Sequence, residues 1–216
     1  MEKQIKIIKK GAVTEIIEKK SRFIAEIIPV SSEEEAIQFI EEIRKKNWNA
    51  THNCYAYTLG DNNEIQRFSD DGEPGGTAGR PMLEVLTENH MHDAAVVVTR
   101  YFGGTLLGTG GLIRTYRRAV NAALENCEIL VKLKGCLLTV KVSYTDYGKI
   151  QHMLENMEMR MLETEYTEMV QLTVVLEAEK KEAFAAALRE ATNAKAIIVK
   201  DEEVFFAHTG GKPVLL

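Results

Sequence analysis

The stretch from Ser69 to Ala119 holds the residue types that could bind an anion. More than half of the chain's 15 glycines lie in it, interleaved with arginines. Glycine lets a backbone adopt positive φ or approach a ligand closely, and arginine contacts carboxylates and phosphates through a planar fork of N–H donors. The candidate anion-, nucleic-acid- or partner-binding residues are Arg80, Arg100, Tyr101, Gly103, Gly104, Gly108, Gly110, Gly111, Arg114, Arg117 and Arg118.

The segment from Gly103 to Gly111 leads into a predicted helix, where backbone N–H groups and the helix dipole favour an anion. It is a poor nucleotide-binding fingerprint, because Ile113 stands where the third glycine of GxGxxG belongs and no GK[ST] follows. Two interpretations stay open. The segment is either an anion site or a tight connection that needs glycine for its geometry alone.

Three carboxylates close together, Asp70, Asp71 and Glu73, could be ligands of a hard cation such as Mg²⁺. Their spacing does not follow an EF-hand loop. The alternative is that they pair with Arg80 or Arg100 and accept hydrogen bonds from N–H groups of their own turn. We assign them a supporting role in orienting the arginines, and we predict no metal site and no cofactor.

His52 and Cys54 share one face of a predicted strand and could begin a zinc or Cys–His site. No second ligand pair has a suitable spacing, so we expect Cys54 to be buried and His52 to line the glycine-rich surface in support. No catalytic residue is assigned. Tyr101 and Phe102 could stack nucleic-acid bases, or one could pack in the core while the other covers an edge.

Apolar periodicity predicts an α+β protein. The elements expected in the first part are strands at 5–8, 12–19, 22–30, 51–59, 64–68 and 94–102 and helices at 32–46, 81–89 and 110–127. The run 94–102 is almost continuously apolar, which indicates a central strand covered on both faces.

The composition shifts near residues 132–135, so we place a domain boundary there, giving domains of 1–134 and 135–216. The second domain has the order β-α-β-β-α-β, with helices from Tyr147 to Met157 and around Phe184 to Ala191. This order is typical of a ferredoxin-like fold. The tail beyond about residue 210 is expected to be loose.

The chain has 216 residues and a formal charge of −5. Residues 1–134 carry 18 Lys and Arg against 19 Asp and Glu, and residues 135–216 carry nine against 13. No global positive charge attracts nucleic acid, so RNA binding would need a local patch, and no DNA specificity is expected. Three cysteines without a CxxC pair fit a reducing cytoplasm, and no apolar run is long enough for a membrane span.

Four sequence segments identify a family resemblance. They are SDDGEPGGTAGRPM (69–82), TRYFGGTLLGTGGLIRTYRRA (99–119), SRFIAEI (21–27) and ATHNCYAY (50–57). They resemble the signature segments of the IMPACT family and of its bacterial YigZ-type branch. The resemblance implies a two-layer first domain, as in ribosomal-protein and RNase PH-type domains. It also implies a ferredoxin-like second domain similar to the C-terminal domain of elongation factor G.

Eukaryotic IMPACT proteins modulate the general amino-acid-control response through a protein partner, but they carry an RWD domain in place of the second domain here. The resemblance therefore implies a non-enzymatic regulator of translation or stress response. It would bind RNA, the ribosome or a translation-associated protein through the glycine- and arginine-rich face. The alternative is an enzyme acting on an anionic or phosphorylated small molecule, with His52 as acid–base and possible metal assistance. A broad positive face would favour binding, and a closed, deep pocket around Asp71, His52 and Arg100 would favour catalysis.

Overall fold

A computed structural model describes residues 4–216. The chain divides into two compact units, of which the first ends at Leu130 and the second runs from Val131 to Leu216. The division falls four residues before the predicted boundary. The reason is that strand β7 (Glu128–Val142) already includes the segment around residues 132–135 whose change in composition suggested a boundary.

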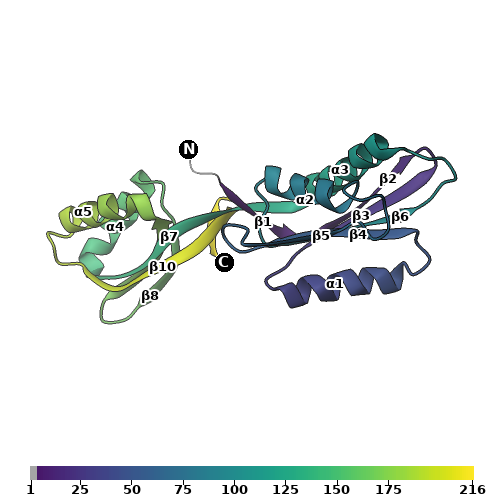
Figure 1. Ribbon diagram of the computed structural model, residues 1–216. Coiled ribbons are helices and arrows are strands. Elements are labelled where there is room, and N and C mark those ends of the chain that lie inside the picture. The colour runs from purple at the N-terminus through teal and green to yellow at the C-terminus, as the bar shows by residue number, and fades with distance from the viewer. Residues whose placement is uncertain (1–3) are drawn as a thin grey trace. The chain divides into compact units, whose positions relative to one another are not determined.

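The first unit is built on a five-stranded antiparallel sheet (Figure 1). Its order is β2 (Ala12–Glu18), β3 (Ser21–Pro29), β6 (Ala94–Tyr101), β4 (His52–Leu59) and β5 (Ile65–Ser69). The apolar run predicted as a central strand is β6, which pairs with β3 on one side and β4 on the other. A further strand, β1 (Ile5–Lys10), pairs with β7.

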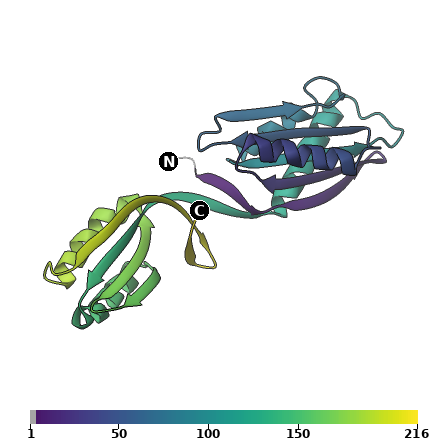
Figure 2. The same cartoon turned by 90° about the horizontal axis from the view of Figure 1, so that it is seen from below.

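Helices cover both faces of this sheet. Helices α2 (Gly79–Glu88) and α3 (Thr109–Glu125) pack on one face, where they bury Val96 and Val98 of β6. Helix α1 (Glu33–Lys46) packs on the other face and buries Ala95 and Val97; Figure 2 shows it lying across the strands. The sheet therefore has a helical layer on each face, whereas a two-layer arrangement would leave one face without helices.

The ends of α1 follow the sequence signals. The Ser32 hydroxyl accepts a hydrogen bond from the Glu35 N–H at 3.2 Å, as a helix N-cap does. Acidic residues occupy the first turn and basic residues the last turn, so both complement the helix dipole. This helix is confirmed with its predicted bounds.

The second unit has the predicted β-α-β-β-α-β order. Its elements are β7, α4 (Tyr144–Asn156), β8 (Met161–Tyr166), β9 (Val170–Glu177), a 3₁₀ turn (Ala178–Lys180), α5 (Lys181–Ala191) and β10 (Ile197–Thr209). The strands lie in the order β10-β7-β9-β8, all antiparallel. Both helices contribute to the core on one face of the sheet. The ferredoxin-like fold is thus confirmed.

The tail expected to be loose is instead ordered. Residues 212–215 form a further strand, β11 (Lys212–Leu215), that pairs with the end of β10. Gly210 and Gly211 both have positive φ, +56° and +73°, which is the backbone of a two-residue hairpin turn. The Gly-Gly pair was a turn signal, and the prediction of a loose tail is wrong.

Candidate functional site

Asp70 organises the start of α2. Its carboxylate accepts hydrogen bonds from the backbone N–H groups of Gly76 at 2.8 Å, Ala78 at 3.0 Å and Gly79 at 2.9 Å. Ala78, at the N-cap position of α2, has no side chain that could accept these bonds. Asp70 therefore supplies the cap from outside the helix. It does not orient an arginine, in contrast to the predicted role.

Asp71 links two elements instead of holding a candidate arginine. One carboxylate oxygen accepts from Arg44 of α1 at 3.2 Å, and the other accepts from the backbone N–H of Asn53 in β4 at 2.6 Å. Asp71 does orient an arginine, but the residue is Arg44, which the sequence suggested only as part of a helix end.

Glu73 is the centre of a buried polar network. One of its oxygens accepts from Arg100 Nη1 at 2.5 Å and from the Tyr116 hydroxyl at 2.7 Å. The guanidinium of Arg100 also packs against the rings of Phe23 and Phe102, with centroids 5.3 and 5.5 Å away. Arg100 is only 4% exposed. The prediction that it belongs to an exposed arginine face is wrong, because alternation along β6 places it on the buried face with Val96 and Val98.

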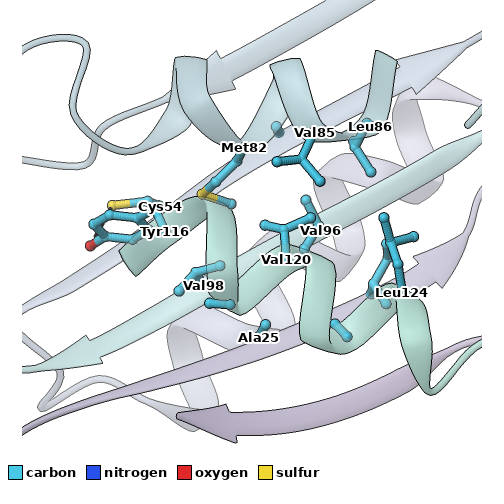
Figure 3. Packing of buried hydrophobic residues seen from close by; sticks show 14 of the residues in the cluster. Ala25, Cys54, Met82, Val85, Leu86, Val96, Val98, Tyr116, Val120 and Leu124 are labelled. Atoms are coloured by element: carbon cyan, nitrogen blue, oxygen red, sulfur yellow. Dashed lines mark hydrogen bonds between the residues drawn. The ribbon is translucent and has the colours of Figure 1, made fainter. Parts of the chain in front are cut away.

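His52 and Cys54 complete this network from β4. His52 Nδ1 donates to the Asp71 carbonyl at 2.8 Å, which leaves Nε2 3.7 Å from the free oxygen of Glu73. Cys54 is buried as predicted, with Sγ 3.3 Å from the Tyr116 hydroxyl; Figure 3 shows the two side chains beside each other under α2. Burial raises the pKa of both the Cys54 thiol and the Tyr116 phenol. The thiol is therefore held in its protonated, weakly nucleophilic form.

A pocket of about 420 Å³ opens above the network, between the loop after Gly72 and the connection from β6 to α3. One wall is polar and includes His52, Glu73 and Arg100. The opposite wall is apolar and is formed by Pro74, Phe102, Leu106, Leu107 and Leu112. At the rim, Leu106 is 81% exposed and Phe102 is 46% exposed. Our reading of the sequence missed the leucine pair at 106–107, although it lies inside the glycine-rich segment.

Three of the other candidate arginines already face carboxylates. Arg80 Nε lies 3.3 Å from Glu84, and Arg117 contacts both Glu84 and Glu88 of α2. Arg118 lies 3.0 Å from Glu18 of β2. Arg114 differs, since it is exposed and makes no ion pair within residues 4–216. The arrangement does not form the broad positive face that the sequence suggested.

The candidate glycines divide into two groups. Gly103 packs against the chain, because a Cβ there would lie 2.0 Å from the Lys20 carbonyl carbon, and Gly104 and Gly108 have φ of +82° and +74°. Geometry alone explains these three positions. Gly110 and Gly111 lie in the first turn of α3, where neither constraint is as strong. Tyr101 is half-buried and donates to the Asn47 amide oxygen at 3.0 Å.

Two broader features complete the site. Across residues 4–216, no cluster of three or more His, Cys, Asp or Glu side chains is arranged to hold a metal ion. In the same range, no helix is long and apolar enough to cross a membrane.

Comparisons with known proteins define the class to which the two units belong. The family model of the Impact N-terminal domain matches residues 19–124, and a domain of unknown function (DUF1949) matches residues 140–195. The IMPACT family member YvyE of Bacillus subtilis is 43% identical over 195 residues, which cover 90% of each chain. The chain belongs to the IMPACT family.

Two solved structures resemble the chain to different extents. The crystal structure of a hypothetical protein covers 94% of this chain and 99% of its own, with a TM-score of 0.57 and 32% identity. The structure of the two-domain translational regulator Yih1 covers 53% of this chain and 47% of its own, with a TM-score of 0.38 and 28% identity. The first similarity extends over both units of the fold.

Proposed function

We propose that this protein is a non-enzymatic regulator of translation that binds a translation-associated protein at the pocket of the first unit. Membership of the IMPACT family supports the link to translation. The observation that carries the mode of binding is the exposed apolar rim of Phe102 and Leu106. Large apolar side chains that stay exposed around a pocket mark sites of protein contact.

A third exposed aromatic residue extends this surface. The Trp48 side chain is 83% exposed and follows Asn47, which bonds to the Tyr101 hydroxyl. The same loop reaches Phe102, whose N–H donates to the Thr51 hydroxyl at 3.1 Å. Trp48 therefore lies at the end of β6 where the pocket opens. Tryptophan is enriched among the residues that dominate binding energy at interfaces.

The charges favour a protein partner over RNA. Nucleic-acid affinity comes mainly from lysine and arginine contacts to phosphates. Arg100 is buried on Glu73, and Arg80, Arg117 and Arg118 have carboxylate neighbours. RNA and ribosomal RNA are therefore the alternatives that an experiment must separate from a protein partner.

The test is binding to purified ribosomes, to ribosome-free translation factors and to bulk RNA. We expect binding to ribosomes or factors to be weakened by Leu106→Asp, and to change little with salt. A partner held by six to ten phosphate contacts would instead lose about 10³–10⁵-fold in affinity between about 50 and 200 mM salt. The matched control is Ile37→Asp, because Ile37 is also an exposed apolar residue but lies on α1. Salt-sensitive binding to bulk RNA that Leu106→Asp does not affect would contradict the proposal.

One observation favours catalysis as the second candidate. His52 and Arg100 stand in the wall of a pocket, and His52 is oriented by its bond to the Asp71 carbonyl. An enzyme acting on an anionic small molecule would use these groups as acid–base and anion-binding residue. Turnover of a phosphorylated or carboxylated metabolite that His52→Gln abolishes would support this candidate. Translation effects that survive His52→Gln would support the regulator.

A further inference from the structure

The first turn of α3 has backbone donors that nothing in the chain satisfies. Gly108, at the N-cap position, provides no side-chain acceptor, and the first turn contains no acidic residue. The N–H groups of Thr109, Gly110 and Gly111 point out of the helix start and make no hydrogen bond within residues 4–216. Gly108 and Thr109 line the pocket, so this positive helix end faces it.

Arg100 is a second, independent donor in the same pocket. Its Nη1 is bonded to Glu73, but its Nε is buried and has no hydrogen-bond partner in the described part of the chain. A buried N–H of an ion without an acceptor costs free energy. An acceptor supplied from the pocket would remove that cost.

Arg114 adds a cation beside the same turn. Its Nη1 lies 3.4 Å from the position that a Cβ on Gly110 would take, and the side chain has no ion pair within residues 4–216. A cation near the positive end of a helix dipole is unfavourable unless an anion lies between them. The helix start, Arg100 and Arg114 thus lack the same thing, an acidic acceptor.

We propose that this pocket binds a carboxylate carried by an apolar group. The carboxylate accepts hydrogen bonds from the first turn of α3 and from Arg100, and the apolar group packs against Phe102, Leu106 and Leu107. Such a ligand matches the one polar and one apolar wall of a pocket of about 420 Å³. A carboxylate fits better than a phosphate dianion because Glu73 already places a negative charge in the polar wall.

This inference deepens the proposed function, on which its biological meaning rests. The carboxyl-terminal residue of a protein partner, when apolar, carries both groups, and capture of terminal carboxylates by free backbone N–H groups is a known mode of peptide recognition. A free carboxylic acid has the same chemistry. The two sources differ in whether residues before the terminal one add affinity.

The test uses N-acetyl-leucine as the probe and the backbone amide NMR signals of Thr109, Gly110 and Gly111 as the readout. We expect saturable shifts with N-acetyl-leucine, and at least tenfold weaker binding of N-acetyl-leucinamide, which lacks the charge. Inorganic phosphate should bind more weakly than N-acetyl-leucine. Equal binding of the acid and the amide, or no saturable shift with the acid, would overturn the inference.

Two variants separate loss of the site from loss of the fold. Thr109→Asp places an intramolecular carboxylate at the helix start, so the melting temperature should be unchanged or higher while N-acetyl-leucine binding falls at least tenfold. Lys45→Gln removes an exposed charge from α1 and is the matched control, with unchanged binding. If Thr109→Asp binds N-acetyl-leucine as the wild type does, the inference is wrong.

A peptide that ends in leucine identifies the source of the carboxylate. Tighter binding of the peptide than of N-acetyl-leucine supports a protein partner, and equal affinity supports a free acid. If neither binds but Leu106→Asp still disrupts binding to ribosomes or factors, the carboxylate inference fails and the proposed function stands. If N-acetyl-leucine binds but no translation component does, the proposed function fails and the pocket remains a carboxylate site.

Discussion

At the scale of single residues, Glu73 is the group on which the site depends. It is 7% exposed and is the described ion-pair partner of Arg100. It also accepts from the Tyr116 hydroxyl and lies near His52. One carboxylate thereby joins the loop after β5 to β4, β6 and α3. The sequence showed an acidic turn, but which arginine the turn would reach depends on contacts across the sheet.

We predict that Glu73→Gln strongly destabilises the first unit. The change leaves the Arg100 charge buried without its counterion, which typically costs about 3–5 kcal/mol. The control is Glu84→Gln, which removes an exposed partner of Arg80 and Arg117 and should cost less than about 1 kcal/mol. Urea denaturation followed by a probe in the first unit measures both. A cost for Glu73→Gln as small as that of the control would contradict the account.

We predict that the Cys54 thiol reacts slowly in the folded protein. Burial raises its pKa, and because the thiolate is the reactive form, labelling near pH 8 should be slower than for a free thiol by more than about 100-fold. Mass spectrometry after timed alkylation measures the rate at each cysteine, and the unfolded protein provides the reference. Rapid labelling of Cys54 would instead indicate an activated nucleophile and favour the enzyme interpretation.

The same raised pKa values predict a loss of stability at alkaline pH. Cys54 and Tyr116 bind their protons more tightly in the folded state than in the unfolded state. Their contribution is therefore complete below the unfolded-state pKa values, about 8.5 for the thiol and about 10 for the phenol. It falls as pH rises above them, by about 1.4 kcal/mol per pH unit for each group. Denaturation between pH 8 and pH 11 should show a smaller fall for Cys54→Ser, and an equal fall in both proteins would contradict this explanation.

At the scale of elements, local patterns predicted most of the secondary structure. Period-two and helical repeats gave the strands and helices, and the apolar run of β6 correctly indicated a strand covered on both faces. The start of α2 could not be assigned in this way, because its cap is Asp70, eight residues before the N-cap position. The burial of Arg100 was accessible from alternation with Val96 and Val98, but the surrounding glycines and arginines suggested a surface.

We predict that Asp70→Ala destabilises the start of α2. The substitution removes the acceptor of three backbone N–H groups, and loss of a helix cap typically costs about 0.5–2 kcal/mol. Asp70→Asn keeps one side-chain oxygen and should cost less. Denaturation and hydrogen exchange at Ala78 and Gly79 measure the effect. If Asp70→Ala and wild type are equally stable, the capping role is wrong.

At the scale of the whole molecule, the chain is an IMPACT-family protein with two units that have separate cores. The resemblance in the sequence predicted both units and the ferredoxin-like topology of the second. The mode of partner recognition was harder to predict. It depends on which charges are neutralised in space, as the pairs of Arg117 with Glu84 and Arg118 with Glu18 show.

The most direct test of the regulator account is the effect of the purified protein on a reconstituted translation system. We predict that wild type and Ile37→Asp change the rate of reporter synthesis with equal potency. Leu106→Asp should be at least about tenfold less potent, as expected when an anchoring side chain worth about 1.4 kcal/mol or more is lost. A wild-type protein without effect, or a Leu106→Asp variant as potent as wild type, would contradict the account.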